Sequence, residues 1–291
     1  MITHPSSFLV TDEEVKGMIE VLSKQEQLKD EVQYLSEAWV RAVMSKPCKN
    51  KKHQRRPFEY SQKKLMDYLT WRKESGITSK ISYYIDSDGT ELAHKTTSNG
   101  CFYWYGVDKD GSPIIWYLAN LTNFDKAVVK DEMENTSLIL QAVLDTMPPH
   151  IYDINFVICF DVFNPLKAMK RPNFAPAFIK TFMKICPDRL KSAVMVTGTI
   201  GHVFYKVANT LAPKSLMDKV VETRSREDAA GMLIEAGVLS EKEVPDFMGG
   251  TFVHDENITK NYPNMMKTIK AAMWKDVGGG DGLNGLGLDV Q

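Results

Sequence analysis

The segment from Phe182 to Val221 is where chemistry would be expected, because it places a turn between a predicted buried strand and a predicted helix. In α/β enzymes such a turn commonly carries a nucleophile or phosphate-binding glycines. Here it contains Thr197, Gly198, Thr199, Ile200 and Gly201. The next residues repeat at the spacing of one apolar helical face, namely Ile200, Val203, Phe204, Val207, Ala208 and Leu211. This pattern favours holding an apolar molecule over cleaving a bond.

Other candidate catalytic and metal-binding residues are isolated. The sequences at Asp86-x-Asp88-Gly and Asp108-x-Asp110-Gly lack the later glutamate of a calcium-binding loop, so they predict tight turns. Of six histidines, only His202 has a suggestive place, at the start of the apolar helix, where we interpret it as a capping or pocket-rim residue. The chain has no G-x-S-x-G, G-x-G-x-x-G or G-x-x-x-x-G-K-[ST] motif. We therefore expect no catalytic residue, no metal and no cofactor.

Composition narrows the class of protein. The 291 residues are 43% hydrophobic and 25% charged, as in an ordinary globular chain with a full core. A formal net charge of −1 argues against a general nucleic-acid-binding protein. The start, MITHPSSFLVTDEE, lacks the pattern of a secretory signal, and no apolar run reaches the ~18 residues of a membrane span. We expect a cytoplasmic protein.

The first part of the chain is predicted to be helical. Thr11 and Glu14 form a capping-box pattern, and helical sequence continues, with breaks, to about Ser45. The segment Lys46–Arg56 is densely basic, and two interpretations stay open: contact with acidic lipid headgroups or a solvated loop. A helix is predicted from about Ser61 to a C-cap at Gly76, followed by a polar, turn-rich stretch to Asn99.

From Gly100 the pattern changes to alternating strands and helices. A hairpin turns at Asp108–Gly111. Strands are predicted at 154–161, 192–197 and 219–223, and helices at 125–147, 172–186, 226–236 and 257–277. This order predicts an α/β fold with a largely parallel sheet covered by helices. We expect a helical lead-in over 1–79, a main domain over 80–256, a C-terminal helix over 257–277 and a flexible glycine-rich tail over 278–291.

Five motifs in order resemble the CRAL-TRIO lipid-binding family, which includes phosphatidylinositol/phosphatidylcholine transfer proteins. They are the lead-in FEYSQKKLMDYLTWRKESGI, the hairpin VDKDGSPIIWY, the strand INFVICFDVFN, the block FMKICPDRLKSAVMVTGTIGHVFYKVANTLAP and the ending VPDFMGGTF. The resemblance covers about Phe58 to Phe252. It implies a CRAL-TRIO-like α/β fold in which the sheet is the floor of a lipid pocket. Helices form its walls and a mobile gate at about Ile200–Leu216, and an N-terminal helical region precedes it.

The resemblance also implies a lipid-headgroup site. Matching positions for inositol-lipid contacts are Asp188, Arg189 and Lys219, with Arg56 matched across an apparent insertion, and we add His202 at the pocket rim. Asp188 replaces the family's glutamate. The strand hydroxyls of phosphatidylcholine-binding members are absent at Phe156–Ile158, and Gly198–Ile200 replaces the family's Asn-Ala-Pro turn. Expected pocket residues are Tyr103, Tyr105, Phe156, Ile158, Phe160, Phe174, Phe178, Phe182, Met195, Thr197, Ile200, Val203, Phe204 and Val207.

The leading hypothesis is a non-enzymatic protein that binds a hydrophobic lipid, most simply phosphatidylinositol, and transfers or presents it during transient contact with a membrane surface. Its expected partners are the phospholipid or isoprenoid ligand and the membrane, and not nucleic acid. An alternative ligand is a tocopherol, retinoid or carotenoid, which the aromatic sequence CFYWYGV favours. Alternatives of other classes are a lipid-sensing regulatory scaffold and an unfamiliar α/β enzyme that uses His202 or Asp161.

Overall fold

The computed structural model describes residues 8–48, 51–86, 101–161 and 170–252. Its first part is a helical layer with a small two-stranded hairpin. The elements are α1 (Asp12–Ser23), η1 (Glu26–Tyr34), α2 (Glu37–Met44), β1 (Pro47–Cys48), β2 (Lys51–Arg55), α3 (Phe58–Ser75) and α4 (Ile77–Asp86). The predicted capping box is confirmed, because Thr11 and Glu14 exchange hydrogen bonds at the start of α1. Gly76 ends α3 with a φ of 61°, as predicted for a left-handed C-cap.

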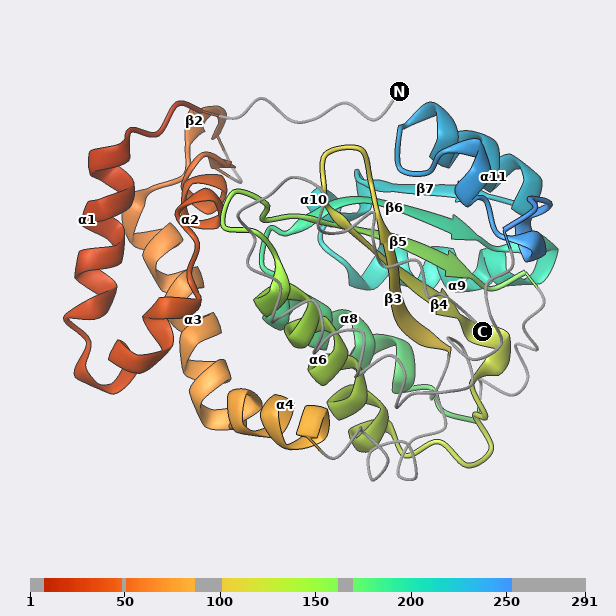
Figure 1. Ribbon diagram of the computed structural model, residues 1–291, viewed down its shortest axis with the longest axis horizontal. Coiled ribbons are helices and arrows are strands. Elements are labelled where there is room, and N and C mark those ends of the chain that lie inside the picture. The colour runs from red at the N-terminus through yellow and green to blue at the C-terminus, as the bar shows by residue number, and fades with distance from the viewer. Residues whose placement is uncertain (1–7, 49–50, 87–100, 162–169, 253–291) are drawn as a thin grey trace.

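A five-stranded sheet follows, in the order β3-β4-β5-β6-β7. Its strands are β3 (Phe102–Val107), β4 (Pro113–Leu118), β5 (Ile154–Cys159), β6 (Leu190–Val196) and β7 (Val220–Thr223). The predicted hairpin is confirmed, since β3 and β4 are antiparallel and Gly111 in their turn has a φ of 86°. The pairs β4–β5, β5–β6 and β6–β7 are parallel, so their amino ends lie along one edge, toward the side occupied by α1–α3 (Figure 1).

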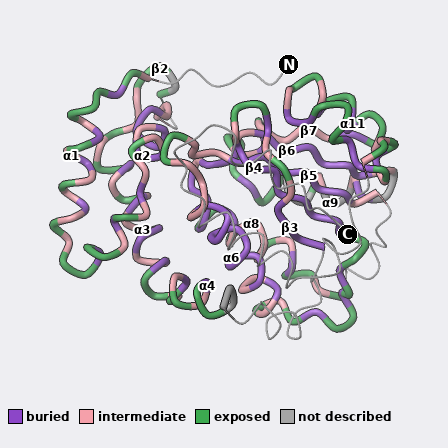
Figure 2. Tube along the Cα trace, viewed as in Figure 1, coloured by how far each residue is buried: buried purple, intermediate pink, exposed green. Residues whose placement is uncertain are grey.

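Helices cover both faces of this sheet. Those of the main domain are α6 (Val129–Thr146), α8 (Phe174–Ile185), α9 (Gly198–Leu211), α10 (Lys214–Met217) and α11 (Arg226–Glu235), with short turns η2 (Ala119–Leu121), η3 (Glu241–Glu243) and η4 (Asp246–Met248). One face packs against α8, which in turn contacts α6 and α9, and the other packs against α11 and η4. Figure 2 shows the strands mainly buried and the outer side of α1 largely exposed. No helix in the described ranges is both long and apolar enough to cross a bilayer.

Two hydrophobic clusters form the interior. One joins buried side chains between Val10 and Leu69, and the other joins those between Ile77 and Met248. Trp71 packs against both clusters, so the helical layer and the sheet share a continuous apolar boundary.

A buried arginine ties the two parts together. Arg72 of α3 is fully buried and donates two hydrogen bonds to Asp145 of α6, at 3.0 and 2.7 Å. It also donates to Glu31 of η1 at 3.0 Å, and its guanidinium lies 3.4 Å from the ring centre of Tyr34. Because a buried charge is tolerated only when it is paired, this arginine fixes α3 against both η1 and α6.

One local prediction was wrong. Residues 77–86 form α4 where a polar, turn-rich stretch was expected, because Ile77 and Ile81 recur at helical spacing and both become buried. The basic segment Lys46–Arg56 contains the β1–β2 hairpin, a structure that neither of its two interpretations specified, and its contact with acidic headgroups stays a prediction. The predicted turn at Asp88-Gly89, the helix at 257–277 and the tail lie outside the described residues.

Candidate lipid-binding site

A group of cations surrounds one aspartate at the amino edge of β6 and β7. We call it the basic cluster; its members are Lys46, Arg56, Lys64, Asp188 and Lys219. Each position follows from the chain path. Asp188 precedes β6 and Lys219 precedes β7, so two parallel strands bring them to one edge. The other members lie after α2, before α3 and within α3.

Asp188 is the centre of the basic cluster. Its Oδ2 accepts hydrogen bonds from Arg56 at 2.5 Å and from Lys64 at 3.0 Å. Burial alone raises the pKa of this carboxyl, but Lys64 and Arg56 outweigh it and lower the pKa to about 2. Asp188 has a φ of 61°, a conformation that aspartate tolerates better than most residues. The carboxylate therefore remains charged while it is held between two cations.

Lys46 and Lys219 are the least compensated cations of the basic cluster. Burial and the neighbouring Lys46 lower the pKa of Lys219 to about 8, although Asp188 opposes the shift. Burial also lowers the pKa of Lys46. The Lys219 ammonium donates a hydrogen bond to the carbonyl of Leu190. These lysines are held in an environment that disfavours their charge, so a bound anion would be stabilised there.

Arg189 lies behind the basic cluster in the protein interior. It is 4% exposed, and its guanidinium lies 3.7 Å from the ring centre of Trp39. The indole N–H of Trp39 donates to the carbonyl of Pro187 at 3.0 Å. This hydrogen bond holds the backbone immediately before Asp188 in place. Burial lowers the pKa of Arg189. Its Nε is buried without a hydrogen-bond partner among the described residues, and the cation–π contact holds the guanidinium against Trp39, behind the Asp188 turn.

His202 lies at the opposite edge of the sheet from the basic cluster. Its Nδ1 is 2.6 Å from Glu222 Oε1, and the Thr197 hydroxyl donates to the same oxygen at 2.8 Å. Thr197 follows the end of β6, whereas Asp188 precedes its start. The seven residues of β6, at ~3.3 Å each, separate the two edges by roughly 20 Å. His202 and the basic cluster therefore cannot contact the same phosphate.

The predicted pocket phenylalanines gather between α8 and the sheet. Phe182 of α8 packs edge to face on Phe156 of β5, with ring centres 5.1 Å apart. Phe178 stacks on Tyr117 at 5.7 Å, and the same tyrosine contacts Phe160 at 5.9 Å. Three other predicted residues are also largely buried: Ile158 and Met195, paired across β5 and β6, and Phe174, which packs on Phe124. This ring-rich surface is the apolar face of the candidate site.

The remaining predicted pocket residues are distributed differently. Tyr103 stacks on Trp116, which contacts Phe247 of η4, so it lies on the other face of the sheet. Tyr105 contacts Phe252 on that same side. The side chains of Ile200, Val203, Phe204 and Val207 lie outside the described part of the structure, although α9 itself is described.

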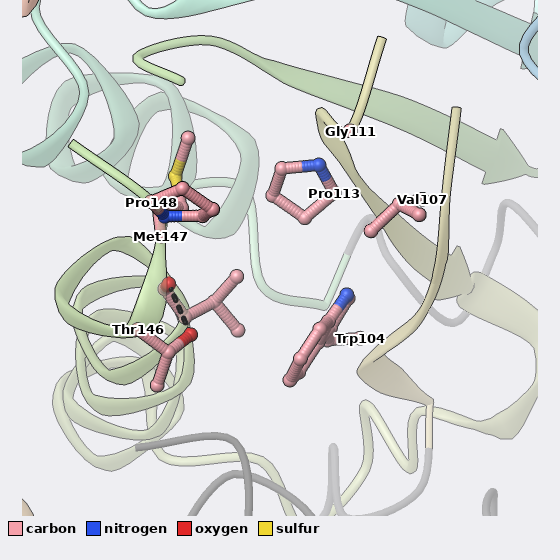
Figure 3. A pocket seen from close by; sticks show the side chains of 8 residues that line it. Trp104, Val107, Gly111, Pro113, Thr146, Met147 and Pro148 are labelled. Carbon is pink, nitrogen blue, oxygen red and sulfur yellow. Dashed lines mark hydrogen bonds between the residues drawn. The ribbon is translucent and has the colours of Figure 1, made fainter. Parts of the chain in front are cut away.

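Two hollows on the described part of the surface lie away from the face between α8 and the sheet. The first, of about 10 Å³, is lined by residues of the β3–β4 hairpin and the end of α6, including Trp104, Pro113 and Met147 (Figure 3). That volume holds about one water molecule. The second, of about 200 Å³, lies among α3, α4 and α6 and is lined partly by Trp71 and Lys130. In this conformation the aromatic side chains on the α8 face pack against one another.

The start of α9 is seated directly on the end of β5. A Cβ added at Gly198, which has a φ of 56°, would lie 3.2 Å from the backbone of Asp161. A Cβ added at Gly201 would lie 3.1 Å from Phe160 Cβ. Asp161 is itself held by Arg226 at 2.6 Å. Glycine at these positions therefore permits a close approach that larger residues would prevent.

Two members of the basic cluster were missed in the sequence. Lys46 belongs to the basic segment, whose density was a signal, but its side chain was not distinguished from its neighbours. Lys64 lies in α3 next to Lys63, which instead pairs with Asp67 one turn away. The two lysines differ because α3 crosses the turn at Asp188, and this crossing brings Lys64, but not Lys63, to the Asp188 carboxylate.

Comparison with known proteins agrees with the observed fold. The solved structure titled "Crystal structure of Sfh5" is similar to this chain with a TM-score of 0.57 and 13% sequence identity, covering 90% of this chain and 99% of that one. At this identity the similarity shows the fold. No curated protein matches the chain. The model of the CRAL/TRIO domain family matches residues 97–250, more than half of the sequence. This chain therefore belongs to the CRAL/TRIO domain family.

Proposed function

We propose that the protein binds one phosphatidylinositol molecule per chain and transfers it between membranes or presents it at a membrane. Membership of the CRAL/TRIO family supports lipid binding or transfer in general. The observation that carries the inositol assignment is the basic cluster, in which Arg56 and Asp188 form an ion pair beside Lys219.

The basic cluster offers both kinds of group that this headgroup needs. The phosphodiester anion binds the guanidinium of Arg56 and the ammonium of Lys219, as phosphates generally bind these two side chains. The inositol hydroxyls donate hydrogen bonds to the Asp188 carboxylate, which its low pKa keeps ionised. In this proposal Arg189 positions the Asp188 turn from behind. His202 and Glu222, at the far edge, contact the ligand away from its headgroup.

The acyl chains lie against the α8 face in this proposal. Burying apolar surface contributes about 25 cal/mol per Å², so a chain enclosed there exchanges the bilayer for the protein at little net cost. Because Phe182 now packs on Phe156 and Phe178 packs on Tyr117, entry requires α8 and α9 to separate from the sheet. In this proposal the moving part is the gate expected at 200–216, which includes most of α9 and most of α10.

Membrane contact is transient and peripheral in this proposal, with the protein otherwise in the cytoplasm. Transfer makes and breaks no covalent bond, so we assign no catalytic residue. Tyr103 and Tyr105 are left out of the pocket because they lie on the face of the sheet opposite α8, where Tyr103 stacks on Trp116 and Tyr105 contacts Phe252.

The first test is to identify what the purified protein carries. Protein made in cells is extracted with organic solvent and the extract is analysed by mass spectrometry. A stoichiometric inositol phospholipid supports the proposal. An empty extract, repeated after incubation with mixed liposomes, contradicts lipid binding and favours the scaffold or enzyme alternatives.

A neutral isoprenoid in the extract would favour a second candidate function. Tocopherols, retinoids and carotenoids are largely apolar, and the ring-rich α8 face suits them. An absorbance spectrum of the extract distinguishes coloured isoprenoids from phospholipids. That result would keep the apolar pocket and remove the headgroup role of the basic cluster.

The second test is lipid transfer between vesicles by a Lys219→Ala variant. Transfer of phosphatidylinositol should fall, because one of its phosphate contacts is lost, whereas transfer of a neutral ligand should not change. Lys63→Ala is the matched control, since Lys63 is 73% exposed and pairs only with its helix neighbour Asp67. Unchanged phosphatidylinositol transfer by Lys219→Ala would overturn the assignment.

A further inference from the structure

The positive charge of the basic cluster exceeds what its acidic neighbours balance. Arg56 and Lys64 both bind one oxygen of Asp188. In the described part of the chain, Lys46 and Lys219 form no ion pair with a carboxylate. The site thus contains two lysines held near each other that lack an anionic partner.

The nearest additional acid does not remove this excess. Asp153 is close enough to favour the charged forms of Lys46 and Lys219. It also accepts a hydrogen bond from Ser112 at 2.6 Å, and its charge acts on Lys191 as well. With Asp153 counted beside Asp188, the four cations of the basic cluster still leave two positive charges. A partly buried double positive charge is unfavourable unless an anion binds.

The missing charge matches one kind of phosphate better than another. The phosphodiester of phosphatidylinositol carries a single negative charge. A phosphate monoester carries about −1.5 to −2 at pH 7 and offers three strong acceptor oxygens. A phosphorylated inositol headgroup keeps its phosphodiester, which balances one of the two excess positive charges, and the oxygens of its added monoester can bind the remaining ammonium and guanidinium groups.

The β1–β2 hairpin places the extra lysine. Lys46 and Arg56 lie at its two ends, where the backbone N–H of Arg56 donates to the carbonyl of Lys46 at 2.7 Å. Arg56 is held further by donating to the carbonyl of Val43 at 3.1 Å. The hairpin therefore fixes Lys46 beside a residue of the proposed headgroup site.

We propose that Lys46 extends this site, so that the protein binds a headgroup bearing a phosphate monoester more tightly than one bearing a phosphodiester alone. The inference rests on the proposed function and specifies its ligand class. The lowered pKa values of Lys46 and Lys219 support it, because a dianion between them would relieve the cost of burying both charges.

The experiment measures binding of the full chain to phosphatidylcholine vesicles that contain either phosphatidylinositol or phosphatidylinositol monophosphate. Lys46→Gln should weaken binding of the monophosphate about tenfold, corresponding to ~1.4 kcal/mol, and weaken phosphatidylinositol binding by a clearly smaller factor. Lys63→Gln removes the same charge from the exposed side of α3 and is the control. Thermal unfolding checks that both variants are folded.

The outcomes separate this inference from the function on which it rests. Equal binding of the two lipids, or an equal loss of both in Lys46→Gln, overturns the monoester preference and leaves the phosphatidylinositol proposal standing. Failure to bind either lipid overturns both. Binding of free inositol bisphosphate is measured in the same way. If it binds tightly and Lys46→Gln weakens that binding, the result supports the monoester site and assigns it to a soluble ligand.

Discussion

Replacing Lys219 with methionine should make the unliganded protein more stable while it impairs lipid binding. Burial lowers the pKa of Lys219 from 10.5 to about 8, so its positive charge opposes folding at pH 7. A shift of this size corresponds to at most about 3 kcal/mol. The side chain keeps some contact with water, and the variant loses the hydrogen bond to Leu190, which contributes about 1 kcal/mol. We expect a net gain of ~1 kcal/mol.

The pH dependence gives this prediction a definite sign. The folded protein releases the Lys219 proton near pH 8, whereas the unfolded chain keeps it to about pH 10.5. Between these values the unfolded state binds more protons, so the contribution of this group to wild-type stability rises with pH. The advantage of Lys219→Met should therefore shrink from pH 8 upward and reverse by about pH 10.5, where only the lost hydrogen bond to Leu190 still distinguishes the two proteins.

Urea unfolding followed by tryptophan fluorescence measures both effects. Lys214→Met is the matched control, because Lys214 is 80% exposed and pairs with Asp218 one turn away, an interaction of at most ~1 kcal/mol. A Lys219→Met variant that is less stable at pH 7, or whose advantage does not change with pH, would refute the view that this charge is poorly accommodated.

Three further substitutions test other parts of the structure. Asp188→Asn should reduce the free energy of unfolding at pH 7 by about 2 kcal/mol, because the folded pKa of Asp188 is lowered to about 2. The difference between the two proteins should narrow as pH falls from about 4 toward 2, and acid titrations of both proteins measure it. Thr11→Ala should cost about 1 kcal/mol by removing the α1 cap, seen as a lower urea midpoint, and an unchanged midpoint would contradict the capping role. Phe182→Ala should cost about 3–5 kcal/mol in the same assay by opening a cavity beside Phe156, and a loss under 1 kcal/mol would show that the α8 face is loosely packed.

The sheet and most helices were predictable because their signals are local. Thr11 and Glu14 mark the first helix, Gly76 ends α3, and the glycine at 111 permits the hairpin turn. These residues act through hydrogen bonds or backbone angles within a few positions, so the sequence contains the whole signal. The parallel sheet follows from the alternation of such elements.

The composition of the basic cluster could not be predicted in the same way. Family resemblance indicated Arg56, Asp188 and Lys219, but Lys64 reaches Asp188 only because two segments 124 positions apart cross. Burial of Arg189 against Trp39 depends on a similarly distant contact. Which of several neighbouring lysines meets an aspartate is decided by tertiary packing, which leaves no periodic trace in the sequence.

The arginine at the boundary between the two hydrophobic clusters limits how this protein can be divided. Residues 97–250 match the family model, yet Asp145 within them is neutralised by Arg72 outside them. A fragment starting at residue 97 would lose this ion pair together with the helices α3 and α4, which cover α8 and α6. The recognisable family segment and the cooperative folding unit are therefore not the same stretch of chain. Any module transplanted into another protein must include α3 and η1.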